Sequence, residues 1–190
     1  ERSQFFEDTG LPWIYPSPNM PMVETAIIYP GMCLIEGTNI SEGRGTTRPF
    51  HLFGAPWINK QNLLTIIRDV AHTNGLAGCI FRAATFEPRF QKHDGLVCHG
   101  IEIVVTDRVQ LDPLLLGIVC LEALIKENSE QFEWRTETYE FVDNPIAIDL
   151  LFGCSEMRER LEAGVSSRSI LEEMQLELSE FLEQRAACLL

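Results

Sequence analysis

A glycine-rich loop over residues 36–47 holds the densest group of side chains in this sequence that could do chemistry. Its twelve residues, EGTNISEGRGTT, include three glycines, two glutamates, one arginine, one asparagine and four hydroxyl side chains. Glycines let a backbone approach a ligand closely and take positive φ angles. Arg44 stands between two of them, and its planar guanidinium suits a carboxylate or phosphate ligand. The loop therefore predicts either a ligand-contact site or a tight turn in which Glu and Arg pair with each other.

Two established motifs can be compared with this loop. A phosphate-binding P-loop is excluded because Gly37 and Gly43 are one residue too far apart, while Arg44 and Gly45 replace its lysine and hydroxyl residue. The acid/base pair of a glycoside hydrolase needs two carboxyl groups about 5–9.5 Å apart. Glu36 and the second glutamate of the loop could span that distance, so this alternative stays open.

A second loop, EPRFQKHDG over residues 87–95, carries several polar side chains between two predicted strands. Lys92 and Arg89 could place positive charge over an anionic ligand, or the loop could be an ordinary solvated hairpin turn. Cys98 and His99 are neighbours on the following predicted strand, so their side chains point to opposite faces. A Cys–His nucleophile pair is therefore excluded.

The histidines and cysteines predict no metal site and no cofactor. The four histidines, at positions 51, 72, 93 and 99, form neither an HxH nor an HExxH motif, and the six cysteines include no CxxC pair.

Composition narrows the class of protein. The chain has 190 residues, enough for one domain, with 45% hydrophobic and 23% charged residues, which is typical of a folded globular protein. Its 15 basic and 28 acidic residues give a net charge of -13. Nucleic acids and anionic membrane surfaces require basic faces, so neither is an expected partner. No stretch approaches the roughly 20 apolar residues that a membrane span needs.

The elements that must position these loops begin after a connector. Residues 1–24 include four prolines between positions 12 and 21, together with Trp13 and Tyr15, and are interpreted as a strap from a preceding domain. A helix is predicted over Val23–Tyr29, stopped by Pro30-Gly31. The apolar run Met32–Ile35 then predicts a short buried strand leading into the glycine-rich loop.

The rest of the chain mixes helical and strand patterns. Strands are expected at 79–86 and 96–106, strand-like segments at 132–142, and an irregular or extended stretch at 50–58. Capped segments predict helices after Asn59, from Asp112-Pro113 to about Lys126, over 155–162 and from Ser167 onward. The predicted fold class is therefore α+β, a small mixed domain over 25–190 with antiparallel strands and several helices.

Blocks of residues throughout the chain resemble the exo-β-N-acetylmuramidases of bacterial peptidoglycan recycling, a family formerly described as a domain of unknown function. They are GLPW at 10–13, PSPNMP at 16–21, YPG at 29–31, EGTN at 36–39, SEGRGTT at 41–47, GAPW at 54–57, FEP at 86–88, VTDR at 105–108 and DLLFG at 149–153, with Lys92, Gly95, Cys98, Gly100 and the closing Arg185 and Leu189-Leu190. The resemblance covers the C-terminal part of the family and the junction that precedes it.

The resemblance implies that a Rossmann-like N-terminal domain of the same protein partners this one across an active cleft. The enzyme would release N-acetylmuramic acid from non-reducing ends of peptidoglycan fragments, in the periplasm or outside the cell, and its catalytic glutamate would lie in the N-terminal part. Peptidoglycan-derived amino sugars would contact this domain through a substrate-side wall with Arg44 as the clamp for the lactyl carboxylate. The expected substrate-binding residues are Glu36, Asn39, Ser41, Glu42, Arg44, Thr46 and Lys92.

Two alternatives stay open. The chain could be a non-catalytic glycan-binding or lid domain, or it could be a stand-alone remnant that neither binds nor cleaves.

Overall fold

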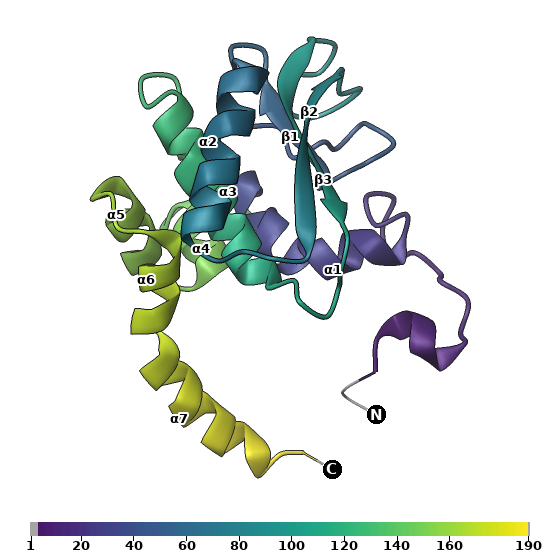
Figure 1. The fold of residues 1–190 in the computed structure, drawn as a ribbon, viewed down its shortest axis with the longest axis vertical. Helices are drawn as coiled ribbons and strands as arrows, with labels where there is room; N and C mark the ends of the chain where they lie inside the picture. Colours follow the sequence, from purple (N-terminus) through teal and green to yellow (C-terminus); the bar gives the residue numbers. More distant parts are fainter. Residues whose placement is uncertain (1–3, 190) are drawn as a thin grey trace.

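A computed structural model describes residues 4–189, the side chains of 175–177 excepted. A three-stranded sheet packs against helices, and one long helix at the C-terminal end extends away from the rest (Figure 1). The α-helices are α1 (Val23–Met32), α2 (Lys60–Thr73), α3 (Pro113–Glu127), α4 (Ala147–Phe152), α5 (Glu156–Glu162), α6 (Ser167–Glu173) and α7 (Gln175–Ala186). The strands are β1 (Leu52–Ala55), β2 (Cys79–Phe86) and β3 (Cys98–Val105), and two 3-10 helices are η1 (Phe6–Thr9) and η2 (Cys33–Gly37). The predicted α+β class is confirmed.

The sheet is antiparallel with the order β1-β3-β2. The predicted pairing of the two long strands is present, with Phe81 opposite Ile103 and Ala83 opposite Ile101. Phe81, Ile101 and Ile103 are buried, because alternate residues of each strand turn to the face that α2 and α3 cover (Figure 1).

Local capping explains where the two long helices begin. The side chain of Asn59 accepts hydrogen bonds from the backbone at the start of α2, and Asp112 does the same for α3, whose first residue is Pro113. Both starts agree with the sequence pattern. Every residue of α3 from Leu115 to Leu124 is buried, so this helix lies at the centre of the hydrophobic core.

Two glycines let α1 cross α3 at very short distance. A Cβ on Gly31 would lie 1.7 Å from the carbonyl oxygen of Pro113, and a Cβ on Gly117 would lie 2.3 Å from the carbonyl oxygen of Gly31. Since contacts this short cannot accommodate a side chain, the crossing requires glycine on both helices.

The strand predicted at Met32–Ile35 is wrong. Pro30 lies inside α1, and the chain continues as the 3-10 helix η2 after Met32. Met32, Leu34 and Ile35 are fully or almost fully buried, as the apolar run indicates. A short run that is apolar on all sides fits a buried strand and a buried helical turn equally well, so periodicity alone could not separate them.

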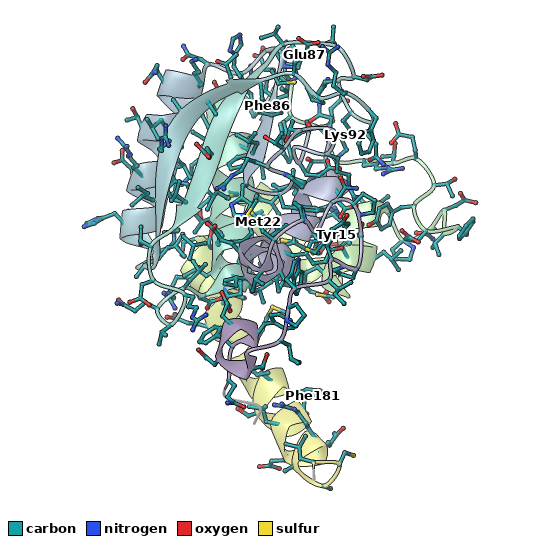
Figure 2. The ribbon with its side chains drawn as sticks, turned by 90° about the vertical axis from the view of Figure 1, so that its right-hand side faces the viewer. Tyr15, Met22, Phe86, Glu87, Lys92 and Phe181 are labelled. Atoms are coloured by element: carbon teal, nitrogen blue, oxygen red, sulfur yellow. The ribbon has the colours of Figure 1, made fainter. Side chains whose placement is uncertain are left out.

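Two further predictions need correction. Residues 132–142 form no strand, only the isolated bridges of Thr38 with Trp134 and of Tyr139 with Val142. The single last helix predicted from Ser167 is broken at Met174 into α6 and α7. In α7 the apolar side chains of Leu178 and Phe181 are exposed, because this helix projects away from the core (Figures 1 and 2).

The segment before α1 is tied to the body by Arg108. The guanidinium of this residue pairs with Glu7 at 2.7 Å and with Asp8 at 2.9 Å, and it lies over the ring of Phe5. Trp13 packs edge-on against Phe6 within the segment. The interpretation of residues 1–24 as a strap from another domain stays a prediction.

Candidate functional site

The two polar loops that the sequence singles out lie against each other. The backbone nitrogen of Arg89 donates to the carbonyl oxygen of Gly45 at 3.1 Å. Gly45 has a φ of +79°, and a Cβ at this position would lie 2.6 Å from that same nitrogen. The contact therefore needs glycine for its backbone angle and for its lack of a side chain.

Three of the four hydroxyl groups of the glycine-rich loop bond to backbone atoms of the loop or of the residue just before it. Thr38 Oγ1 donates to the carbonyl of Ile35, Ser41 Oγ accepts from the backbone of Gly43, and Thr46 Oγ1 donates to the carbonyl of the same glycine at 2.6 Å. Ser41 also pairs with Gly54 of β1 through backbone hydrogen bonds. These residues build and anchor the turn.

Asn39 fastens a distant segment to the loop. Its side-chain nitrogen donates to the carbonyl of Gln131 at 2.7 Å, and its side-chain oxygen accepts from the backbone nitrogen of Glu133 at 3.2 Å. Its own carbonyl oxygen lies 2.9 Å from Nε2 of His93 in the second loop. One asparagine thus joins three segments that lie far apart in the sequence.

Arg44 pairs with both glutamates of its loop. Its Nη2 lies 2.9 Å from Oε2 of Glu36, and its Nε lies 3.1 Å from Oε1 of Glu42. The guanidinium also lies over the ring of Phe50, with 5.1 Å from its carbon to the ring centroid. The structure thus shows the internal Glu–Arg pairing that the sequence offers as the alternative to ligand contact. Arg44 thus lies between Glu36 and Glu42. An acid/base pair needs room for the substrate between its two carboxyl groups, and here that room is taken by a side chain of the protein.

Lys92 reaches from the second loop into the first (Figure 2). Its ammonium donates to the carbonyl oxygens of Ile35 at 3.0 Å, Glu36 at 3.3 Å and Ile40 at 2.9 Å, and it lies 3.1 Å from Oε2 of Glu42. Burial lowers the pKa of Lys92, and the charge of Glu42 opposes that shift. An ammonium group has three donor hydrogens, so these contacts use its capacity fully.

Glu36 is buried, and its hydrogen-bonding capacity is only partly used. Burial raises its pKa, and Arg44 works against that shift. The hydroxyl of Tyr139 donates to Oε2 of Glu36 at 3.2 Å, while Oε1 is buried with no hydrogen-bond partner among the described residues. Burial, followed by the charge of Glu36, also raises the pKa of Tyr139. The cluster of two buried glutamates, Glu36 and Glu42, and two partly buried cations, Arg44 and Lys92, is hereafter called the ionic cluster.

An open crevice of about 560 Å³ lies beside the ionic cluster. It is lined by Thr38, Asn39, Gln91, Lys92, His93, Glu133, Trp134, Arg135, Thr136 and Glu137. Two of the seven predicted substrate-binding residues, Asn39 and Lys92, thus line the crevice, and the other five are not among its lining residues. The binding role predicted for all seven stays a prediction.

Sequence reasoning missed the third wall of the crevice, residues 133–137. This segment is held by the bridge of Thr38 with Trp134 and by a hydrogen bond from the backbone nitrogen of Arg135 to the carbonyl oxygen of Gly37. The adjacent Trp134 and Arg135 were a usable signal, since an aromatic and a guanidinium side by side are common in sugar and anion sites.

A metal site and a membrane-spanning helix are both absent from the described part of the chain. No three His, Cys, Asp or Glu side chains there are arranged to hold a metal ion. Among the described helices, none has the length and apolar character of a membrane span.

Comparison with known proteins shows the family of the chain. The family model described as "Exo-beta-N-acetylmuramidase NamZ, C-terminal" matches residues 27–190. Peptidoglycan beta-N-acetylmuramidase NamZ of Bacillus subtilis (strain 168) is 39% identical over 185 residues, which are 97% of this chain and 42% of the relative. The chain thus spans about two fifths of the length of this curated relative.

Two crystal structures share the fold. One is of a DUF1343 family protein of Bacteroides fragilis NCTC 9343, with a TM-score of 0.74 and 22% identity over 96% of this chain and 46% of the other. The other is of a second DUF1343 family protein of the same organism, with a TM-score of 0.60 and 24% identity. That match covers 92% of this chain and 43% of the other. With its fold and nearly its whole length matched, the chain belongs to the family of the C-terminal part of the exo-β-N-acetylmuramidase NamZ.

Proposed function

We propose that this chain is the C-terminal part of an exo-β-N-acetylmuramidase that releases N-acetylmuramic acid from non-reducing ends of peptidoglycan fragments. The observation that carries the proposal is the 39% identity with a peptidoglycan β-N-acetylmuramidase over 97% of the chain. The crevice at residues 38–39, 91–93 and 133–137 supports it with a polar surface that has room for a sugar.

In this proposal the crevice is the substrate-side wall of a cleft, and a Rossmann-like domain of the same protein forms the other wall. The ionic cluster favours such a division of labour, because each of its two carboxylates is paired with a cation. A general acid needs a proton and a free path to the glycosidic oxygen. The catalytic carboxyl group is therefore assigned to the preceding domain.

The ionic cluster then acts as a scaffold for the wall. It ties the loop at 36–47 to the loop at 87–95, while Asn39 and Tyr139 connect both to the segment at 131–139. A wall that is held rigid before the sugar arrives loses little conformational entropy on binding. The substrate assigns the protein to the periplasm or to the outside of the cell, which is part of the same proposal.

The test is an assay of a chromogenic N-acetylmuramide with the 190-residue chain alone and with the chain joined to a family N-terminal domain. We expect hydrolysis by the joined protein and binding without hydrolysis by the chain alone. Hydrolysis by neither, with sugar binding retained, would instead support the non-catalytic glycan-binding or lid domain. If neither binding nor hydrolysis occurs, the muramidase assignment fails.

A further inference from the structure

Three cationic side chains belong to the ionic cluster or line the crevice. They differ in how many of their hydrogen-bond donors are already in use. Arg44 is engaged by two glutamates, and Lys92 by one glutamate and three carbonyl oxygens. Arg135 is different. Its Nη2 donates to the carbonyl oxygen of Thr138 at 3.1 Å, and its Nε lies 3.8 Å from Glu137, whose side chain is 78% exposed.

A guanidinium has five donor hydrogens in a fixed fork. Within the part of the chain that the structure describes, Nη1 of Arg135 makes no hydrogen bond, and the side chain is 31% exposed where it lines the crevice. An exposed pair at 3.8 Å contributes about 0–1 kcal/mol, so Glu137 is easily displaced by another carboxylate.

The position of Arg135 is nevertheless fixed. Its backbone nitrogen is bonded to the carbonyl of Gly37 at 2.9 Å, and its guanidinium carbon lies 5.2 Å from the ring centroid of Tyr139. That ring is in turn held by the hydrogen bond from its hydroxyl to Glu36. Through Tyr139 the ionic cluster orients Arg135 without using its donors.

The crevice is lined by two cations, Lys92 and Arg135, and by two carboxylates, Glu133 and Glu137. The chain as a whole carries a net charge of -13 and repels anions. Among the groups that lower the pKa of Lys92, after burial, is the positive charge of Arg135, so the two cations act on the same part of the crevice. Lys92 is already paired with Glu42, so Arg135 is the cation of the two that can pair with a ligand carboxylate.

We propose that Arg135 is the residue of the crevice that binds the ligand's carboxylate, and that in N-acetylmuramic acid this is the lactyl carboxylate. The naming of the ligand rests on the proposed function. The guanidinium can hold both carboxylate oxygens at once, which a lysine cannot. N-acetylglucosamine has no lactyl group, and a muramyl peptide has its lactyl carboxylate converted to an amide. Arg135 therefore distinguishes the free acid from both.

The first experiment is a calorimetric titration of the 190-residue chain with N-acetylmuramic acid, its lactyl amide and N-acetylglucosamine. The unmodified chain should bind the free acid at least about tenfold more tightly than the other two, since a charge-assisted hydrogen bond is worth about 1.5–3 kcal/mol. Arg135→Gln should abolish that preference and leave the two neutral ligands unaffected. Arg135→Lys should restore part of it.

Arg82→Gln is the matched control. Arg82 is 65% exposed on β2 and pairs only at 3.5 Å with Glu102, so this variant removes the same charge away from the crevice. It should keep the preference for the free acid. Each variant is first compared with the unmodified chain by its thermal unfolding midpoint, and Arg135→Lys serves as the test if Arg135→Gln does not fold.

The second experiment separates this inference from the proposed function. In the joined protein, Arg135→Gln should raise KM for a chromogenic N-acetylmuramide at least about tenfold and change kcat little, because the contact is to the ground-state carboxylate. Normal KM in this variant would overturn the role of Arg135 while the muramidase assignment stands. Carboxylate-dependent binding at Arg135 in a protein that hydrolyses nothing would support Arg135 and remove the assignment. No preference for the free acid in the unmodified chain overturns the inference.

Discussion

The glycine-rich loop at 36–47 and the segment at 131–142 differ in where their polar groups are directed. The loop is rich in functional side chains, but three of its four hydroxyls, both glutamates and Arg44 are engaged within the protein. No site residue was predicted in the other segment, yet Arg135 has unused hydrogen-bond donors at the crevice. A loop that is dense in functional side chains can thus be the scaffold of a site, while a segment with fewer of them supplies the contacts to the ligand.

Removal of Lys92 should produce the largest effect on stability. In Lys92→Met, Glu42 loses a buried cation and three carbonyl oxygens lose their donor. Breaking a buried pair in this way costs about 3–5 kcal/mol of unfolding free energy, measured by urea denaturation. Lys60→Met is the control, since Lys60 bonds only to exposed Thr85 and should change stability by less than about 0.5 kcal/mol. Equal stability of the two variants would contradict the scaffold role.

The contact between the two loops should be the next most sensitive feature. Gly45→Ala adds a Cβ 2.6 Å from the backbone of Arg89 at a positive φ, whereas Gly95→Ala meets a positive φ with open space around it. The left-handed backbone costs about 1–2 kcal/mol in both variants, and overpacking adds about 1–3 kcal/mol at Gly45 alone. Denaturation of the two variants side by side measures the difference. If both lose the same stability, the loops are not held together at Gly45.

The pH dependence of stability should distinguish two buried glutamates. Burial raises the pKa of Glu36, so its contribution to stability is complete below its usual pKa of about 4.5 and is lost as pH rises through the raised value. The pKa of Glu122 is lowered: burial alone would raise it, but hydrogen bonds from Lys126 and Ser167 outweigh burial. The contribution of Glu122 to stability is therefore lost as pH falls through the lowered pKa.

Thermal or urea unfolding from pH 3 to 8 tests this pair with Glu36→Gln and Glu122→Gln. Relative to the unmodified protein, Glu36→Gln should gain stability as pH rises above about 4.5. Glu122→Gln should lose stability, relative to the unmodified protein, as pH rises toward about 4.5 and should stay level above it. Each change is at most about 1.4 kcal/mol per pH unit. Parallel curves for the two variants would show that the two carboxyl groups have similar environments.

Arg135→Gln should have the smallest effect on stability. Its exposed ion pair and its contact with the ring of Tyr139 are together worth about 0.5–1 kcal/mol. Arg44→Gln leaves buried Glu36 without a cation and Glu42 with Lys92 alone, and should cost several times more, about 3 kcal/mol. Denaturation curves that rank the two arginines in the opposite order would reverse the assignment of scaffold and contact surface.

Local signals in the sequence predicted much of the fold. The caps Asn59 and Asp112 and the alternation at 79–86 and 96–106 depend on neighbours within a few residues, and the structure has helices and paired strands there. The run at 32–35 was misassigned because it is apolar on all sides, and the segment at 132–142 because its aromatic residues pack without forming a sheet.

The sequence by itself determined the class of fold, the family resemblance and the polar character of two loops, because these follow from composition, short-range pattern and motif order. Only the tertiary structure decided which polar groups are in use. Lys92 finds its partners more than 50 positions earlier in the chain, and the crevice is assembled from segments near residues 38, 92 and 135. A side chain's free donors are what remains after such long-range contacts are made, and spacing along the chain carries no record of them.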